Sequence, residues 1–231
     1  MKGKILFSSG IIGIILMVLG QLSFSINDAF VKLAVIELNS DLSTFNVLFI
    51  RGIMTTTLIF IYLVFFEKKE VIKILKIKEF HKRGLYEVLT ALFFFTGLIT
   101  MPISEVYTLL MTNPLFVILF AYLFLKEKVG IRRLCAVIIG FIGVIFVINP
   151  KDIDFNYLFI FPIIAAIFLT IRDLQTKYIV TKTNNFEIIF ITSLLVTIFT
   201  GLVSLFIGFD ITINQIHYIF ISSLFIIIGY L

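Results

Sequence analysis

The chain has 231 residues, of which 60% are hydrophobic and 14% are charged, and its mean hydropathy is +1.14. Ordinary soluble domains are about 45–50% apolar and about 25% charged, so this composition excludes a water-soluble fold and makes lipid the solvent for much of the surface. The formal net charge of +5 does not indicate nucleic-acid binding, because the basic residues lie in short segments between apolar runs. The single cysteine, Cys135, excludes an intrachain disulfide and a cysteine-based metal site.

Eight apolar runs follow one another along the chain, most of them close to the length of about 20 residues that crosses a bilayer. They are continuously apolar and do not alternate with polar residues, which favours helices over the strands of a barrel. The sequence therefore predicts an all-α, polytopic membrane helical bundle. The expected spans are residues 11–31, 45–66, 85–101, 106–125, 131–148, 157–176, 186–209 and 216–231.

Positive charge in the connecting segments predicts the orientation of the chain. Cytoplasmic loops of membrane proteins are enriched in Lys and Arg, and a cytoplasmic N-terminus puts 16 of the 19 basic residues on that side. We therefore expect a multi-pass protein of the bacterial inner membrane with its N-terminus in the cytoplasm. The residues counted are Lys2, Lys4, Lys68, Lys69, Lys73, Lys76, Lys78, Lys82, Arg83, Lys126, Lys128, Arg132, Arg133, Arg172, Lys177 and Lys182.

Three features of the connections carry further expectations. The longest connection, residues 67–84, mixes apolar residues with lysines and predicts a short amphipathic helix on the inner leaflet. Pro102 and Ser104 lie between the third and fourth spans and predict a tight antiparallel hairpin, with Ser104 capping the fourth span. The last span ends at Leu231 without a charged flank, which leads us to expect a fragment of a longer protein or a truncated gene product.

The second half of the chain resembles the first. An offset of 145 residues places Ile26, Asp28 and Lys32 on Ile171, Asp173 and Lys177, and FNVLF (45–49) resembles FEIIF (186–190) after a four-residue gap. The first unit would hold five spans, an odd number, so the second would enter the membrane upside down. Inverted repeats of this kind are typical of secondary transporters.

Several motifs resemble the EamA-type transporters of the drug/metabolite transporter superfamily. Within residues 97–150, the strings PLF (114–116), LKEK (125–128) and GFIGV (140–144) follow the family's pattern, and FIR (49–51) resembles its second-span arginine signature. The resemblance covers nearly the whole chain.

This resemblance implies ten spans in two five-span repeats, a basket of helices and transport by alternating access. Residues 1–150 would be the first repeat, and residues 151–231 would be an incomplete second repeat of about three spans. The expected substrates are amino acids, nucleoside-like metabolites, S-adenosylmethionine or drugs. We expect a small-molecule substrate and the lipid bilayer as partners, no cofactor, no metal and no catalytic residue, and leave homo-oligomer formation open.

Arg51 lies about six residues into its span, where a guanidinium is costly unless it faces a polar interior or reaches the headgroups. One interpretation is snorkelling to the outer headgroups; the other is a contact with an anionic substrate or an interior ion pair.

Asp28 with Lys32, and Asp173 with Lys177, are four residues apart on a helix face. Each pair is interpreted either as an interfacial ion pair or as a gate between the repeats.

Asn113 and Pro114 lie in the middle of the fourth span. A proline there removes a backbone donor, so the sequence predicts either a broken helix that exposes polar groups to a substrate path or a simple kink. Glu105 and Tyr107 begin the same span, where the helix dipole favours a carboxylate, and capping by Glu105 is weighed against a role in proton coupling.

Two other functions compete with transport. A membrane-embedded enzyme would need clustered ionisable groups, yet the only histidines, His81 and His217, are far apart in the sequence. A truncated membrane protein without transport activity is the second alternative.

Overall fold

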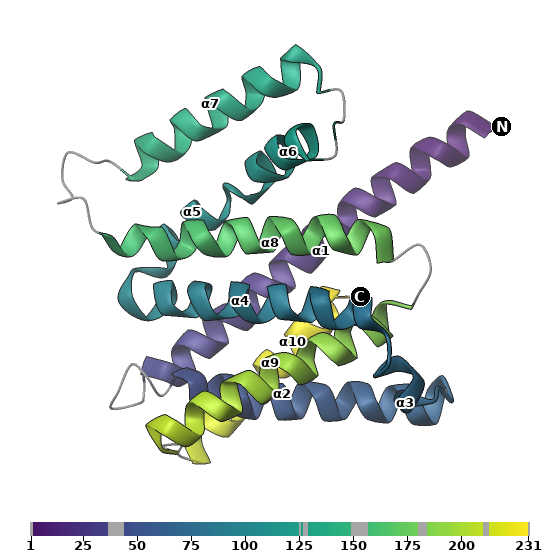
Figure 1. Ribbon diagram of the computed structural model, residues 1–231, viewed down its shortest axis with the longest axis vertical. Helices are drawn as coiled ribbons and strands as arrows, with labels where there is room; N and C mark the ends of the chain where they lie inside the picture. Colours follow the sequence, from purple (N-terminus) through teal and green to yellow (C-terminus); the bar gives the residue numbers. More distant parts are fainter. Residues whose placement is uncertain are drawn as a thin grey trace. The chain divides into compact units, whose positions relative to one another are not determined.

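The computed structural model describes residues 2–36, 44–124, 126, 129–148, 157–179, 184–209 and 213–230, without the side chains of residues 2–10, 147, 148 and 214. Every regular element within these ranges is a helix (Figure 1). Helices satisfy all backbone hydrogen bonds within one segment, which continuously apolar sequence in lipid requires. The described chain forms two compact units, Met1–Lys76 with Asn184–Leu231 and Ile77–Thr183, which we call unit 1 and unit 2.

Unit 1 combines the beginning and the end of the chain. Within it, α1 packs along α10 and α2 packs along α9. Aromatic rings join the first pair, because Phe24 meets Tyr230 edge-on at 4.9 Å and Phe30 stacks on Phe225 at 6.5 Å. The elements are α1 (Lys2–Ile36), α2 (Thr44–Ile61), the π-helical turn η2 (Tyr62–Phe66), α3 (Val71–Ile74), α9 (Asn185–Ile207) and α10 (Ile213–Tyr230).

Unit 2 is built around α8, which packs along α4 and also contacts α5 and α6. Figure 1 shows α4 and α8 running alongside each other. Helix α7 contacts α5 and α6 and leaves many of its apolar side chains, and Cys135, exposed. The elements are α4 (Lys78–Thr100), α5 (Ile103–Leu110), α6 (Asn113–Leu123), α7 (Ile131–Ile148), the short 3-10 helix η3 (Tyr157–Phe159) and α8 (Ile160–Ile179).

Six of the described helical segments are long and apolar enough to cross a membrane. The polytopic helical bundle is therefore confirmed, whereas the count of eight spans stays a prediction, because α7 and α10 are not among the six. The segments are Ile11–Ile36, Thr44–Phe66, Lys78–Thr100, Ile103–Leu123, Tyr157–Ile179 and Asn185–Ile207.

The fourth span is broken near its middle, which is one of the two outcomes that Pro114 predicts. Helix α5 ends at Leu110 and α6 begins at Asn113, with Pro114 in the first turn of α6, where its missing N–H costs least. The predicted cap at Ser104 is wrong: Pro102 is the N-cap of α5 and no side chain caps that helix. Ser104 lies inside the first turn, and its carbonyl accepts a hydrogen bond of 2.8 Å from Thr108 Oγ1.

Arg83 and Arg172, which we counted on the cytoplasmic side of the membrane, lie beyond the first turn of their helices. The connection after α2 is shorter than predicted, with a single helical turn at α3, because α4 already begins at Lys78. Arg83 is therefore the sixth residue of α4, and Arg172 is the thirteenth residue of α8. Neither side chain counts toward the charge of the loops, and the cytoplasmic orientation of the N-terminus stays a prediction from the remaining residues.

The predicted repeat boundary at residue 150 lies outside the described residues. Units 1 and 2 divide the chain by contacts and not by repeats, since unit 1 contains the first helices of the chain together with the last ones. The repeats at 1–150 and 151–231 stay a prediction. Most of the LKEK motif (125–128) also lies outside the described residues. Of its four residues, the structure describes Lys126 alone.

Candidate functional site

A part-buried network of charges joins α4 to α8 in unit 2. Arg172 Nη1 donates to both carboxylate oxygens of Glu87, at 3.0 and 2.9 Å. The other edge of the same guanidinium faces Asp173, whose Oδ1 accepts from Nε at 3.0 Å and from Nη2 at 2.7 Å. One guanidinium is thus held between two carboxylates, one on its own helix and one on the neighbouring helix.

Arg83 completes this network from the preceding turn of α4. Its Nη1 lies 3.7 Å from Glu87 Oε2, and its Nε donates to Thr176 Oγ1 on α8 at 2.8 Å. Together Arg83, Glu87, Arg172 and Asp173, here called the unit 2 network, carry two positive and two negative formal charges. In a low-dielectric surrounding, balanced and hydrogen-bonded charges avoid the several kcal/mol that each isolated ion would cost.

The broken span is tied to this network through Asn113. Its Nδ2 donates to Asp173 Oδ2 at 3.2 Å, and its Oδ1 lies 2.7 Å from Thr170 Oγ1. Asn113 is the first residue of α6, so the break in the helix lets its amide reach across to α8. The amide fixes the second oxygen of Asp173 while Arg172 holds the first.

Unit 1 contains a second polar group, at Arg51. The Arg51 side chain is buried, and its Nη1 donates to Asn27 Oδ1 on α1 at 3.2 Å. The same amide oxygen accepts from Ser222 Oγ on α10 at 2.7 Å, and the Asn27 amide donates to Asp28 Oδ1 at 2.7 Å. Arg51 thus points into polar side chains of its own unit, while a contact with an anionic substrate or an interior ion pair stays a prediction.

Helices α2 and α9 cross closely at a group of hydroxyls. Thr56 Oγ1 donates to Ser193 Oγ at 3.1 Å and lies 3.3 Å from Thr197 Oγ1. Gly52 makes this approach possible, since a methyl group there would overlap Thr197 Oγ1. Small residues and hydroxyls at a crossing are typical of helix packing in membranes.

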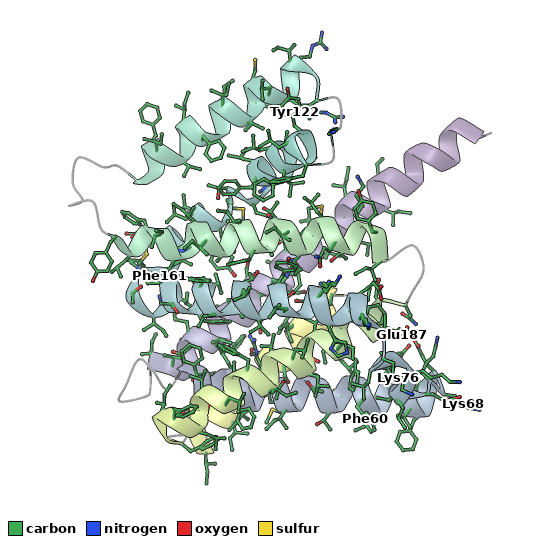
Figure 2. All side chains as sticks on the ribbon, viewed as in Figure 1. Phe60, Lys68, Lys76, Tyr122, Phe161 and Glu187 are labelled. Atoms are coloured by element: carbon green, nitrogen blue, oxygen red, sulfur yellow. The ribbon has the colours of Figure 1, made fainter. Side chains whose placement is uncertain are left out.

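Charged and polar groups close the end of the α2–α9 pair where α2 ends and α9 begins. Lys69 Nζ lies 2.9 Å from Glu187 Oε1, and Asn184 Nδ2 donates to both oxygens of Glu67 at 2.7 and 2.9 Å. Figure 2 labels Glu187 at the start of α9 and Lys68 just after η2, at the same end of unit 1. At the other end of the pair Asn46 Nδ2 donates to the carbonyl of Gly208 at 2.8 Å.

The hydrogen bond and charge of Glu187 raise the pKa of Lys69 above its ordinary value. A raised lysine pKa contributes stability that is present below the unfolded-state pKa of 10.5 and lost as the pH rises through the folded-state pKa. We expect Lys69→Gln to destabilise the protein only slightly, because Lys69 is solvent-exposed. This destabilisation should be constant from pH 7 to about pH 10, and 1 M salt should reduce it. Unfolding temperatures in detergent, at low and high salt, check this.

Lys73→Gln is the matched control, because Lys73 pairs with Glu70 at 2.8 Å and both side chains are far more exposed. Its effect should be smaller still. A Lys69→Gln effect that grows with salt would contradict the ion pair.

The remaining predicted site residues lie apart from the unit 2 network or at its edge. Lys32 lies inside α1, which continues to Ile36, and Lys177 lies in the last turn of α8. The contacts given above for Asp28 and Asp173 involve Asn27, Arg172 and Asn113, so the pairing with the lysines stays a prediction.

Glu105 lies in the first turn of α5, as predicted. The Tyr107 ring, two residues on, meets Phe94 edge-on at 5.9 Å. Among the described residues, no three His, Cys, Asp or Glu side chains gather into a group that could hold a metal ion.

Sequence reasoning missed Glu87, the central carboxylate of the unit 2 network. The available signal was an acidic residue inside an apolar run, four residues after Arg83, since such spacing puts both residues on one helix face. It also missed Ser222, for which the sequence carries no comparable signal, because serines are ordinary in membrane helices.

The comparisons with known proteins identify the family of the chain. The model of the EamA-like transporter family matches residues 11–149, which is more than half of the chain. The chain belongs to the EamA-like transporter family. This confirms the resemblance to the EamA-type transporters, and the description of the matching model names a family of transporters.

Relatives with stated activities are transporters of different solutes. A riboflavin transporter of Vibrio cholerae is 36% identical over 104 residues, which are 45% of this chain and 35% of the relative. An S-adenosylmethionine uptake transporter of Rickettsia bellii is 26% identical over 187 residues, 81% of this chain and 62% of the relative. A pseudopaline exporter of Pseudomonas aeruginosa is 23% identical over 179 residues, 77% of this chain and 61% of the relative.

The chain spans less than two thirds of the length of these curated relatives. No solved structure matches it.

Proposed function

We propose that this chain moves a small, charged metabolite across the bacterial cytoplasmic membrane by alternating access. The unit 2 network carries the proposal: four ionisable side chains and an asparagine meet between membrane-spanning helices, where ionisable groups are costly and mark solute pathways. Amino acids, nucleoside-like compounds and drugs are the solute classes to test. Riboflavin, S-adenosylmethionine and pseudopaline, which the names of the relatives give as their solutes, are added to these classes to form the panel of test solutes.

The crossing of α2 and α9 supports the inverted repeat on which alternating access would depend. Aligning FNVLF (45–49) with FEIIF (186–190) makes Thr56 and Thr197 equivalent positions. A two-fold axis relating the repeats must pass between equivalent residues, and these two hydroxyls lie 3.3 Å apart at the crossing. The packing of α1 on α10 and of α8 on α4 supports it as well, because the third span of each repeat then packs on the first span of the other.

Replacing Arg51 by alanine should lower transport roughly tenfold or more, since it removes a charge-assisted hydrogen bond and the cation of unit 1's polar group. Uptake and efflux of labelled solutes in membrane vesicles measure this. Because the Arg133 side chain is exposed on α7, Arg133→Ala removes the same charge without touching either polar group and serves as the control.

Unchanged transport in Arg51→Ala would remove Arg51 from the solute pathway. If no solute of the panel moves in vesicles that contain the unmodified chain, the proposed function itself is contradicted.

A further inference from the structure

The unit 2 network becomes more exposed from α4 toward Asp173. The side chains of Arg83 and Glu87 are 5% and 13% exposed, that of Arg172 is 17% exposed, and that of Asp173 is 37% exposed. Arg83 and Glu87 therefore form the inner side of the network. Asp173 and the guanidinium edge beside it form the more exposed side of the network.

The two edges of the Arg172 guanidinium have different partners. Nη1 faces Glu87, while Nε and Nη2 face Asp173 Oδ1. The Nε–Nη2 edge is the planar fork that binds carboxylates through two parallel hydrogen bonds. A solute carboxylate can take this edge while Glu87 continues to hold Nη1, and Asp173 is then left to accept hydrogen bonds from a solute cation.

Charge balance decides which solute fits this exchange. The unit 2 network has no net formal charge, so a simple anion or cation would leave an uncompensated charge at a site of low dielectric constant. A zwitterion brings one charge of each sign, and the balance is kept after it has separated Arg172 from Asp173. Asn113 Nδ2 still holds Asp173 Oδ2, which keeps that carboxylate in position.

We propose that Arg172 and Asp173 bind the carboxylate and the ammonium group of an α-amino-acid zwitterion. The proposal rests on the proposed function, because it names the solute class of the same network. In an α-amino acid the two charged groups are attached to one carbon, which suits a carboxylate and a guanidinium fork that lie 2.7 Å apart.

Binding to the purified, unmodified chain in detergent tests the proposal without relying on transport. The probes are methionine and S-adenosylmethionine, methionine methyl ester, which lacks the anion, and N-acetylmethionine, which lacks the cation. We expect at least one zwitterion to bind roughly tenfold or more tightly than both derivatives, because each derivative loses a charge-assisted contact. Equilibrium dialysis with labelled methionine or S-adenosylmethionine, and competition by the derivatives, measure the ratios.

Asp173→Asn should weaken zwitterion binding and bring N-acetylmethionine close to methionine, because the cation site is lost while Arg172 remains. Arg133→Ala should leave every ratio unchanged. Equal binding of the zwitterions and the derivatives, no binding of any zwitterion, or an unchanged ratio in a monodisperse Asp173→Asn protein would overturn the proposal.

The two proposals fail separately. A chain that discriminates zwitterions in this way but moves no solute in vesicles contradicts transport alone. A chain that moves only uncharged solutes contradicts the zwitterion site alone.

Discussion

Replacing Arg172 by glutamine should destabilise the protein by about 3–5 kcal/mol and abolish transport. The substitution leaves the part-buried carboxylates of Glu87 and Asp173 with Arg83 as the remaining cation of the unit 2 network, and removing one partner of a desolvated ion pair has costs of this size. The loss is expected to exceed that of any substitution on the exposed face of α7. The fraction of monodisperse protein after heating in detergent, followed by size-exclusion chromatography, measures it.

The double variant Arg172→Gln with Glu87→Gln distinguishes unpaired charge from lost packing. It restores equal numbers of positive and negative charges, so its loss of stability should be clearly smaller than the sum of the two single losses. Simple additivity of the two substitutions would show that Arg172 and Glu87 do not depend on each other. Arg133→Ala is again the control for removing an arginine from an exposed position.

Replacing Gly52 by alanine should separate α2 from α9 and lower stability by about 1–3 kcal/mol, the usual cost of adding a methylene to a packed interface. The added methyl would overlap Thr197 Oγ1 and also crowd Thr197 Cβ, at 3.1 Å. Moving Thr197 aside would break the hydroxyl contact with Thr56. Unfolding temperature in detergent is the measurement.

Gly143→Ala on α7 is the matched control, because a methyl group there would meet no atom within 4 Å. Alanine is the better helix former by about 1 kcal/mol, so this control should be neutral or stabilising. A Gly52→Ala protein that is as stable as the Gly143→Ala protein would contradict the close crossing.

Continuous apolar runs were sufficient to predict the helical membrane protein, because only helices satisfy the backbone of such segments in lipid. Pro114 predicted a disturbance of the fourth span, because proline removes a backbone donor, but did not decide between a broken helix and a simple kink. Helix ends next to water were less predictable. Lys78 to Gly84 are polar enough to be interpreted as a loop, yet α4 includes them, because Arg83 finds Glu87 and Thr176 as partners inside unit 2.

The candidate site was predictable only where one residue carried the signal by itself. Arg51, Asn113 and Asp173 are polar residues in or near apolar runs, and each has a polar partner in the structure. The pairing of Glu87 with Arg172 depends on which faces α4 and α8 turn toward each other across 85 positions of sequence. Helical periodicity does not show which two helices pack together, because it defines the apolar face of one helix and not the helix that packs against that face.

The equal numbers of positive and negative groups in the unit 2 network have a consequence for membrane voltage. Moving one elementary charge through a potential of 100 mV costs about 2.3 kcal/mol, but a displaced group with no net charge does almost no electrical work. A movement that carries Arg83, Glu87, Arg172 and Asp173 together would therefore proceed equally well in energised and de-energised cells. Any current that accompanies such a movement would have to come from the solute or from charges elsewhere in the chain.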